Sequence, residues 1–302
     1  MVRDVDGLMS TSCSPNGDPA ALSATRNRAP VLASAPDHAS AAVIRWSVVL
    51  AYYNEAEGIQ DTLHHLVGQT RPFRLILVDN GSSDASTRMC HQALRGTGID
   101  YCVLHEDFPG QTAAFARGLR EVATEFVATC DADTIYPSAY LAEAERLFDE
   151  GGPATVAASA YFLAPHDLES WRALLMAAHQ RLAGMLLTKQ THVGAAGQCF
   201  RTRILRAAGG YSPQRWPFVL GDHEVMHQVM KHGRQAMAWG HWCAPSQRRS
   251  SAIRWSLLER VAYHATPFAL KDRYFRWLGL RFAARGMLSR RLRTRDWESA
   301  SA

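Results

Sequence analysis

The sequence lacks paired cysteines, long apolar runs and an apolar N-terminal segment. Its six cysteines are scattered along 302 residues without a CxxC pair. This spacing favours reduced thiols in a cytoplasmic protein over a disulfide framework or a zinc knuckle. No run approaches the roughly 18 to 20 apolar residues of a membrane-spanning helix, and no secretory signal opens the sequence, so we expect neither.

The net charge is small, but it is unevenly distributed. The chain has 33 Lys and Arg and 28 Asp and Glu, a net charge of +5. Residues 246–302 contain 13 basic and 4 acidic side chains, a local charge of +9, so the preceding residues carry −4. A surplus confined to one terminal block disfavours a basic coat for nucleic acid, and we expect no nucleic-acid partner.

The sequence does have a regular alternation of short apolar runs and helical patterns. Residues 1–42 have few large apolar side chains, so a disordered leader is expected. The order that follows predicts an α/β fold: a Rossmann-like, mainly parallel sheet flanked by helices, with ligands at the carboxyl ends of the strands. Strands are expected at 46–53, 73–79, 101–105 and 125–130, and helices at 59–69, 86–94 and 111–122.

The second half of the sequence gives a coarser pattern. The apolar stripe at 168–187 fits a long core-facing helix, and a lipid-contacting surface is the alternative. We expect one domain over 43–249 and a basic helical tail over 250–302. The other expected elements are a helix at 137–149, a strand at 154–162, a helix that follows the Gly-rich segment 194–197 and ends at Gly209, and a strand at 235–239.

Acidic side chains follow two of the expected strands. Asp79 ends the strand 73–79, and Asp131 and Asp133 follow the strand 125–130. The carboxyl ends of parallel strands share one edge, so these side chains are expected to converge on one crevice. Two carboxylates one residue apart suit Mg²⁺ or Mn²⁺ together with substrate phosphates. A solvated pair of turn acids is the alternative, because Asp is common in turns.

Three segments, in this order, resemble the family 2 glycosyltransferases, which have the A-type glycosyltransferase fold. They are VVLAYYNE at 48–55, LVDNGSSD at 77–84 and DAD at 131–133. The resemblance extends from about residue 43 to residue 233. It implies transfer of a sugar from a nucleotide-diphosphate donor, a divalent metal, and inversion at the anomeric carbon.

The resemblance also implies roles for individual residues. Asp131 would lie beside the ribose and the metal, and Asp133 would ligate the Mg²⁺ or Mn²⁺ that bridges the diphosphate. The residues that would contact the nucleoside are Ala51, Tyr53, Glu55 and Asp79.

Two arginines after the last expected strand are candidates for the donor diphosphate. Guanidinium groups match phosphate oxygens geometrically, so Arg248 or Arg249 would approach them, with a solvated charge as the alternative. Nearby, Arg254-Trp255 resembles part of the Gln-x-x-Arg-Trp signature of processive relatives, but Ser251 stands at the Gln position. We therefore expect a non-processive enzyme.

An acid at a helix start corresponds to the catalytic acid pair of the family, which usually reads Glu-Asp. Here Gly221 replaces the Glu and Asp222 stands where the family has its base. The resemblance implies that Asp222 takes the proton of the acceptor hydroxyl. Capping of the helix is the alternative role, and one residue can do both.

Other functional classes remain as alternatives. The run from His223 to His227 spells HExxH, a zinc-hydrolase motif, but that interpretation leaves the strand-end acids unexplained. A sugar nucleotidylyltransferase would need a Gly-rich, Lys-containing loop where this chain has Asn54-Glu55-Ala56-Glu57. A non-catalytic nucleotide-sugar-binding protein is the third alternative.

The basic tail interleaves aromatic and arginine side chains from Lys271 to Arg295. Both kinds spread around a helix, so no clean amphipathic stripe is predicted. One interpretation is contact with an anionic membrane at its cytoplasmic face, where a lipid-linked acceptor would be met. The other is a helix that packs its aromatic rings on the domain and extends its arginines into water.

Overall fold

The structure is a computed structural model. It describes residues 43–163, 175, 178, 180, 182, 189–191, 193–246 and 256–293. The expected leader, most of the expected helix 168–187, and the candidates Arg248 and Arg249 lie outside the described residues. Within the described ranges, no helix has the length and apolar character needed to cross a membrane.

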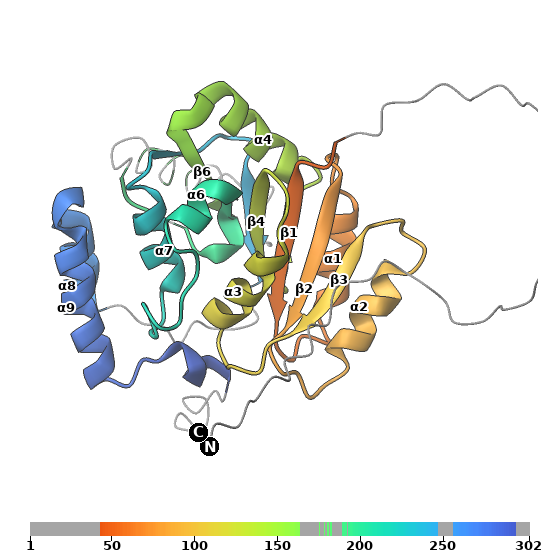
Figure 1. The fold of residues 1–302 in the computed structure, drawn as a ribbon, viewed down its shortest axis with the longest axis horizontal. Coiled ribbons are helices and arrows are strands. Elements are labelled where there is room, and N and C mark those ends of the chain that lie inside the picture. Colours follow the sequence, from red (N-terminus) through yellow and green to blue (C-terminus); the bar gives the residue numbers. More distant parts are fainter. Residues whose placement is uncertain are drawn as a thin grey trace, which may run out of the picture.

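Seven strands form one mainly parallel sheet, as the sequence predicts (Figure 1). Their order is β3-β2-β1-β4-β8-β6-β9. Among these strands β8 runs antiparallel to both of its neighbours, and the other described pairs are parallel. The strands are β1 (Trp46–Tyr52), β2 (Phe73–Asp79), β3 (Tyr101–His105), β4 (Phe126–Asp131), β6 (Thr155–Ser159), β8 (Gln198–Arg201) and β9 (Arg234–Ala236).

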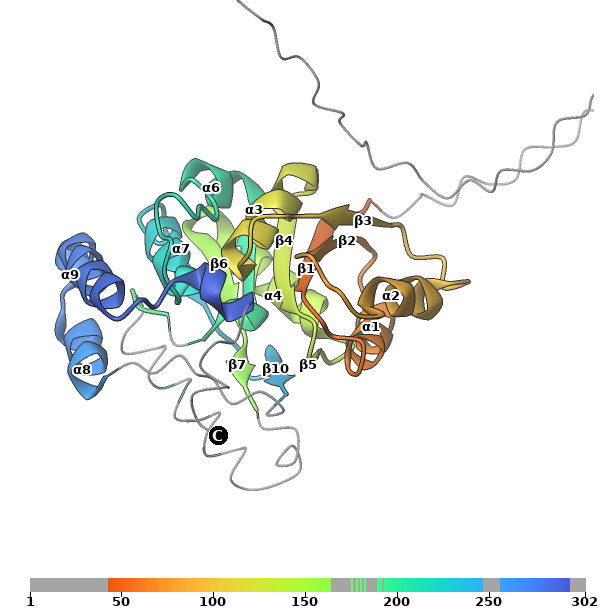
Figure 2. The same ribbon diagram turned by 90° about the horizontal axis from the view of Figure 1, so that it is seen from below.

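Helices cover both faces of the sheet (Figure 2). One buried cluster joins the sheet to α1 (Ile59–Val67), α2 (Ser86–Leu94) and α4 (Tyr140–Gly151). A second cluster joins the opposite face to α3 (Gln111–Glu121), α6 (Thr202–Ala207) and α7 (Gly221–Val229). The helices α1, α2 and α3 begin or end within a few residues of their expected limits, because each carries an apolar stripe that the sheet buries.

Helix α3 lies directly on the sheet. A Cβ atom at Gly118 would stand 2.4 Å from Cγ1 of Val49, so only glycine lets the helix backbone approach β1 this closely. The first turn of α3 is thereby fixed at the carboxyl edge of the strands.

The register of the central strands places the strand-end acids on one edge. Ala51 of β1 is paired with Asp131 of β4 on one side and with Val78 of β2 on the other. Tyr52 is paired with Asp79. The convergence expected from a parallel sheet is therefore present in the backbone.

Two predicted strands differ from the structure. The strand expected at 154–162 is divided, because β6 ends at Ser159 and β7 (Tyr161–Phe162) leaves the main sheet. It pairs with β10 (Trp242–Pro245), which in turn pairs with β5 (Thr134–Ile135) in a small separate sheet. The strand expected at 235–239 ends at Ala236 as β9. Strands this short depend on their partners, so local pattern does not define their ends.

The helix expected to end at Gly209 is preceded by a strand that the sequence pattern misses. β8 contains Gln, Cys, Phe and Arg, which show neither alternation nor a run of β-branched residues. It lies between β4 and β6, and its first three residues are buried. Pairing on both sides therefore stabilises as a strand a segment with little strand propensity of its own.

The C-terminal part is helical, as expected, and its aromatic side chains pack inward. α8 (Leu257–Ala265) and α9 (Lys271–Ala284) lie beside α7 in both ribbon views. Two short 3-10 helices, η4 (Phe268–Leu270) and η5 (Ser289–Arg293), follow α8 and α9 respectively. Trp216, in the loop before α7, contacts Phe275 and Phe282 with ring centroids 5.4 and 6.3 Å away. The interpretation of a tail that packs on the domain is therefore correct for this part of the chain.

A buried carboxylate holds α8 to α9. Glu259 completes a capping box with Ser256, and its Oε1 accepts hydrogen bonds from Arg281 and Arg285. Burial alone would raise the pKa of Glu259, but the hydrogen bonds from these partners outweigh it and lower the pKa to about 2. This value lies below the roughly 4.3 of an unfolded Glu, so the ionised side chain stabilises the fold above that pH.

The Glu259→Gln variant should lower the free energy of unfolding by about 1 to 3 kcal/mol at pH 7, because it breaks a buried ion-pair network. The difference from wild type should shrink as pH falls from about 5 toward 2, since the wild-type stabilisation is lost in that window. Urea unfolding at several pH values measures it. Glu150→Gln is the control: this 61% exposed partner of Arg146 should change stability by no more than about 0.5 kcal/mol. Equal effects of the two variants would contradict the prediction.

Candidate functional site

Four carboxylates from three segments, Asp131 and Asp133 at or just after the end of β4, Glu55 after β1 and Asp222 in α7, gather at the carboxyl edge of the sheet. Asp131 ends β4, and its Oδ1 accepts a 2.7 Å hydrogen bond from Nε2 of Gln111 at the start of α3. Burial and the negative charges of Asp133, Asp222 and Glu55 raise the pKa of Asp131 to about 8. The acids therefore lie close enough to oppose one another's ionisation.

The pKa of Asp222 is shifted in the opposite direction. Burial alone would raise its pKa, but the charge of His223, hydrogen bonds from the His223 ring and backbone N–H, and the backbone N–H of Ala195 outweigh it and lower the pKa. Asp222 does not cap α7. The N-cap residue is Leu220, which has the left-handed conformation with φ 63°. Asp222 lies in the first turn of α7, where the helix dipole also favours its charge.

The glycine that replaces the Glu of the family has a local reason. A Cβ atom at Gly221 would stand 2.6 Å from Oγ1 of Thr112 in α3. The first turns of α3 and α7 are therefore in close contact, and no larger side chain fits at position 221 without movement of Thr112. This contact fixes Asp222 relative to Gln111 and Asp131.

The expected nucleoside residues lie on two loops that are tied together. Asp79 accepts hydrogen bonds from the Ser82 backbone N–H (2.8 Å) and from the Thr87 hydroxyl (3.1 Å). The backbone N–H of Glu55 donates to Oγ of Ser86 at 2.7 Å. Asp79 therefore stabilises the turn after β2 and also lies at the carboxyl edge of the sheet. Glu55, only 5% exposed, is held to the start of α2 through Ser86. Ala51 and Tyr53 are partly buried at the end of β1 and just beyond it.

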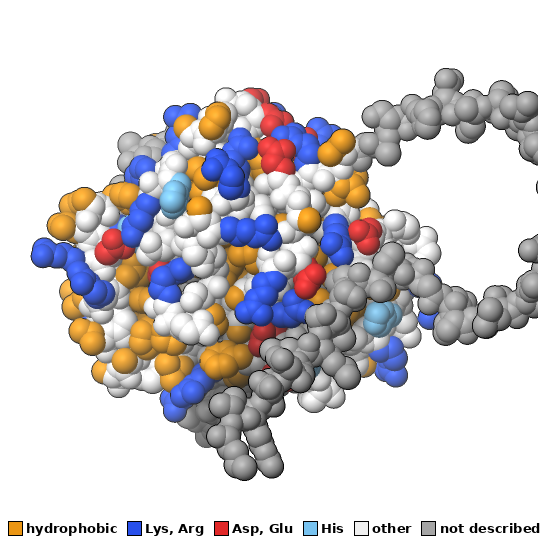
Figure 3. All heavy atoms as spheres, viewed as in Figure 1, with side chains coloured by type: hydrophobic (Ala, Val, Ile, Leu, Met, Phe, Trp, Pro, Cys, Tyr) orange, Lys and Arg blue, Asp and Glu red, His pale blue; other side chains and the backbone are white. Residues whose placement is uncertain are grey.

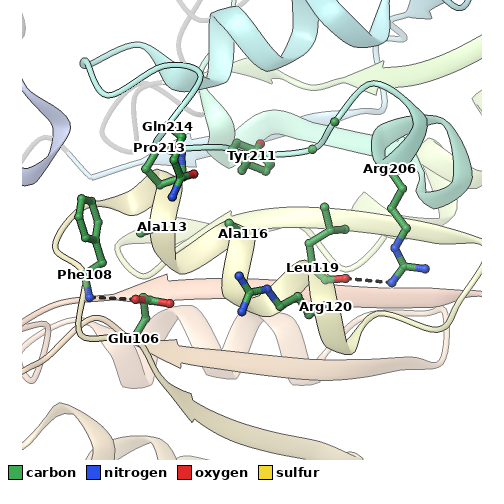
Figure 4. A pocket seen from close by; sticks show the side chains of 12 residues that line it. Glu106, Phe108, Ala113, Ala116, Leu119, Arg120, Arg206, Tyr211, Pro213 and Gln214 are labelled. Atoms are coloured by element: carbon green, nitrogen blue, oxygen red, sulfur yellow. Dashed lines mark hydrogen bonds between the residues drawn. The ribbon is translucent and has the colours of Figure 1, made fainter. Parts of the chain in front are cut away.

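A cavity of about 420 Å³ lies between α3 and the loop after α6 (Figure 4). Its lining includes Glu106, Phe108, Arg120 and Gln214. Tyr211 lines it too, and the Tyr211 hydroxyl reaches Oγ1 of Thr129 at 3.5 Å. Burial raises the pKa of Tyr211, and the charges of Asp222 and Asp131 raise it further.

The HExxH residues are engaged by three different partners. His223 Nδ1 lies 3.1 Å from Asp222, Glu224 accepts from Arg215 at 2.8 Å, and His227 Nε2 lies 3.0 Å from Asp272 of α9. In the parts of the chain that the structure describes, no group of three His, Cys, Asp or Glu side chains has the arrangement of a metal site. The zinc interpretation therefore has no support in the geometry.

Sequence reasoning gave no individual site role to three residues found here, Gln111, Thr112 and Tyr211. Gln111, which bonds Asp131, follows a glycine at a helix start, and that position was the available signal. Thr112 and Tyr211 lie in segments, 110–118 and 209–211, that resemble segments of the family, but their contacts join parts far apart in the chain and could not be read from the sequence.

Open α/β sheets bind their ligands at the carboxyl ends of the strands, where these carboxylates lie. A family model described as "Glycosyl transferase family 2" matches residues 47–208, more than half of the chain. The chain therefore belongs to glycosyl transferase family 2, and the resemblance found in the sequence is confirmed.

Curated relatives match a shorter region. The undecaprenyl-phosphate 4-deoxy-4-formamido-L-arabinose transferase of Serratia proteamaculans (strain 568) is 32% identical over 111 residues, which cover 35% of this chain and 34% of that protein. The poly-beta-1,6-N-acetyl-D-glucosamine synthase of Staphylococcus epidermidis is 30% identical over 90 residues, covering 30% of this chain and 22% of that protein. The matches thus span about a third or less of these relatives.

Solved structures share the fold. The mannosyltransferase PcManGT of Pyrobaculum calidifontis, in complex with GDP-Man and Mn²⁺, has a TM-score of 0.58 and 20% identity over 76% of this chain and 64% of its own. Residues 1–349 of S. aureus TarS, in complex with UDP-GlcNAc, give 0.53 and 16% over 80% of this chain and 73% of theirs. At these identities the likeness shows the fold alone, the expected A-type glycosyltransferase fold.

Proposed function

We propose that this protein is an inverting, non-processive glycosyltransferase that moves a sugar from a nucleotide-diphosphate donor to an acceptor hydroxyl. The observation that carries the proposal is that two carboxylates close together at the edge of the sheet have pKa values shifted in opposite directions. The pKa of Asp131 is raised and that of Asp222 is lowered. Carboxylates whose environments separate their pKa values in this way are typical of sites where one acts as a base.

The acidic cluster has the ligand chemistry of a divalent-cation site, although within the described residues no three of its carboxylates are arranged around one point. Asp131, Asp133, Asp222 and Glu55 repel one another, and a cation would relieve that repulsion. Oxygen ligands are those that Mg²⁺ and Mn²⁺ prefer, so Asp133, with Asp131 beside it, would hold the ion. When bound, the ion neutralises charge that develops on the departing nucleoside diphosphate. The Mn²⁺ of PcManGT supports this choice.

The protein's own groups carry the proton transfer. Asp222 accepts the proton of the acceptor hydroxyl while the acceptor oxygen bonds to the anomeric carbon and the bond to the diphosphate breaks, leaving its electron pair on the nucleotide. Attack from the face opposite the leaving group inverts the anomeric centre. Ala51, Tyr53, Glu55 and Asp79 would hold the nucleoside, and we keep Arg248 or Arg249 as candidates for the diphosphate.

Release of nucleoside diphosphate from UDP-, GDP- and dTDP-sugars in the presence of Mn²⁺ tests the proposal. Turnover with at least one donor, dependent on an added hydroxyl acceptor, is the expected result. Tight binding of a nucleotide sugar without turnover under any acceptor condition would instead favour the alternative, a nucleotide-sugar-binding protein. If the enzyme is non-processive, as the sequence predicts, the product should be extended by a single sugar.

We also propose peripheral contact with an anionic membrane, where a lipid-linked acceptor would be met. Leu257, Leu258 and Val261 share one face of α8 and are 77%, 58% and 56% exposed. In Figure 3, apolar and basic side chains gather over the region of α8 and α9. Within the described residues 256–293, Asp272 is the one exposed acid, and Lys231 pairs with it at 2.8 Å. The exposed arginines of this region are Arg260, Arg273, Arg276, Arg285, Arg290 and Arg291.

Relatives named as undecaprenyl-phosphate transferases support an acceptor carried on a lipid. The exposed leucines and valine would enter the boundary between headgroups and acyl chains while the arginines meet anionic headgroups. The cytoplasmic location and the inner face of the membrane remain predictions.

Wild-type protein should sediment with vesicles that contain phosphatidylglycerol, and added salt should weaken the binding because it screens the arginines. Combined replacement of Leu257, Leu258 and Val261 by Ser should lower the partition coefficient at least about tenfold, since buried apolar area is lost. The control is Val43→Ser, which removes an apolar side chain that is 80% exposed outside α8. If neither salt nor the triple substitution changes binding to the vesicles, the α8 surface is not the membrane contact.

A further inference from the structure

The residue next to the proposed base makes two hydrogen bonds to a single carboxylate oxygen. The backbone N–H of His223 lies 2.9 Å from Oδ1 of Asp222, and ring atom Nδ1 lies 3.1 Å from the same oxygen. The two side chains are only 15% and 16% exposed, so water competes little for these bonds. One oxygen of Asp222 is therefore occupied by His223.

The C-terminal helix α8 fixes the orientation of the His223 ring. Tyr263, which is 3% exposed, meets it edge-on with ring centroids 5.8 Å apart. The Tyr263 hydroxyl is itself anchored, since it lies 3.1 Å from the backbone N–H of Thr191 and 3.3 Å from the Thr191 carbonyl oxygen. A helix outside the sheet thus determines the position of a side chain beside the base.

The second oxygen of Asp222 faces a glycine. A Cβ atom at Gly194 would stand 3.2 Å from Oδ2, so a side chain at this position would crowd that oxygen. The two oxygens of the carboxylate are therefore not equivalent, because Oδ1 is turned to His223 and Oδ2 to the Gly194 loop, whose Ala195 backbone N–H also donates to this carboxylate.

We propose that His223 is a positioning residue for the transfer reaction, and that Tyr263 holds it in place. The inference rests on the proposed function. His223 donates its Nδ1–H to Oδ1 of Asp222 and so directs Oδ2 to the acceptor hydroxyl. During transfer the acceptor proton moves to Oδ2, the acceptor oxygen bonds to the anomeric carbon, and the nucleoside diphosphate leaves with the electron pair. His223 keeps its proton throughout.

This role gives a function to His223, which has none once the zinc interpretation is set aside. His227, the other histidine of the HExxH run, lies against Asp272 and Phe275 of α9. The two histidines therefore serve different parts of the structure, and only His223 is placed to act on the base. A hydrogen bond to a carboxylate reduces its basicity but fixes its direction, which a proton acceptor needs.

A pair of variants of equal shape tests the inference. Asn and Leu have similar size, but the Asn amide can donate from a position near that of Nδ1. His223→Leu should lower kcat roughly 10- to 100-fold, the effect of losing a hydrogen bond to a charged group, with the KM for the nucleotide sugar unchanged. His223→Asn should stay within about threefold of wild-type kcat. Nucleotide binding and thermal unfolding of both variants show that the fold is intact.

Wild-type kcat in His223→Leu would overturn the inference, as would an equal loss in both variants. Asp222→Asn in the same assay separates this failure from failure of the proposed function. If Asp222→Asn is inactive and His223→Leu is fully active, only the role of His223 is wrong. If Asp222→Asn retains transfer, Asp222 is not the base, and the proposed role of His223 is wrong as well.

Discussion

Replacement of Asp222 by Asn should lower kcat for sugar transfer roughly 10²- to 10⁴-fold, the usual contribution of a general base. The amide keeps the shape of the side chain, and its oxygen can still accept the hydrogen bonds from His223, but it cannot take a proton. Binding of the nucleoside diphosphate should change little, because Asp222 acts on the acceptor. Initial rates of nucleoside diphosphate release, together with calorimetric binding of UDP and GDP, measure both quantities.

The matched control is Asp107→Asn, the same chemical change at a side chain that is 96% exposed. It should leave both kcat and binding at wild-type values. Retention of transfer by Asp222→Asn within about tenfold of wild type would remove Asp222 from the role of base. The family assignment would stand in that case, since it depends on the match over residues 47–208.

Replacement of Asp133 by Ala should abolish Mn²⁺-dependent binding of the nucleoside diphosphate. A divalent ion supplies several kcal/mol of charge stabilisation, so transfer should fall at least about 100-fold. Titration of Mn²⁺ by calorimetry, with and without UDP or GDP, measures the loss without any need for turnover. Asp131→Asn should weaken binding as well, because it removes a second oxygen ligand from the same cluster.

Asp107→Asn again provides the control, and its Mn²⁺ titration should match that of wild type. Unchanged Mn²⁺ dependence in Asp133→Ala would contradict the metal assignment. That result would favour the alternative interpretation, in which Asp131 and Asp133 are solvated acids of a turn.

The fold was predictable from sequence because its signals are local. The strands β1, β2, β3 and β4 and the helices between them lie close to their expected limits. Each is specified by the spacing of its own apolar residues, and alternation of strands and helices leads to a parallel sheet. The placement of Asp79 and Asp131 at one edge followed from the same reasoning.

The short strands and the tail show where local reasoning stops. β8 and β10 have no pattern of their own and exist through their partners in the sheets. The aromatic residues of α9 spread around the helix, so the sequence left open whether they pack inward. The loop that contains Trp216 decides the question by burying Phe275 and Phe282.

The sequence by itself determined the fold class, the family and which acids stand at strand and helix ends, because neighbouring residues encode these features. Only the tertiary structure decided which of the acids meet, why position 221 is a glycine beside Thr112, and which partner each histidine of the HExxH run takes. It also brought Tyr263 of α8 against His223. These contacts join segments far apart in the chain, and their energies depend on burial and charge that no local pattern contains.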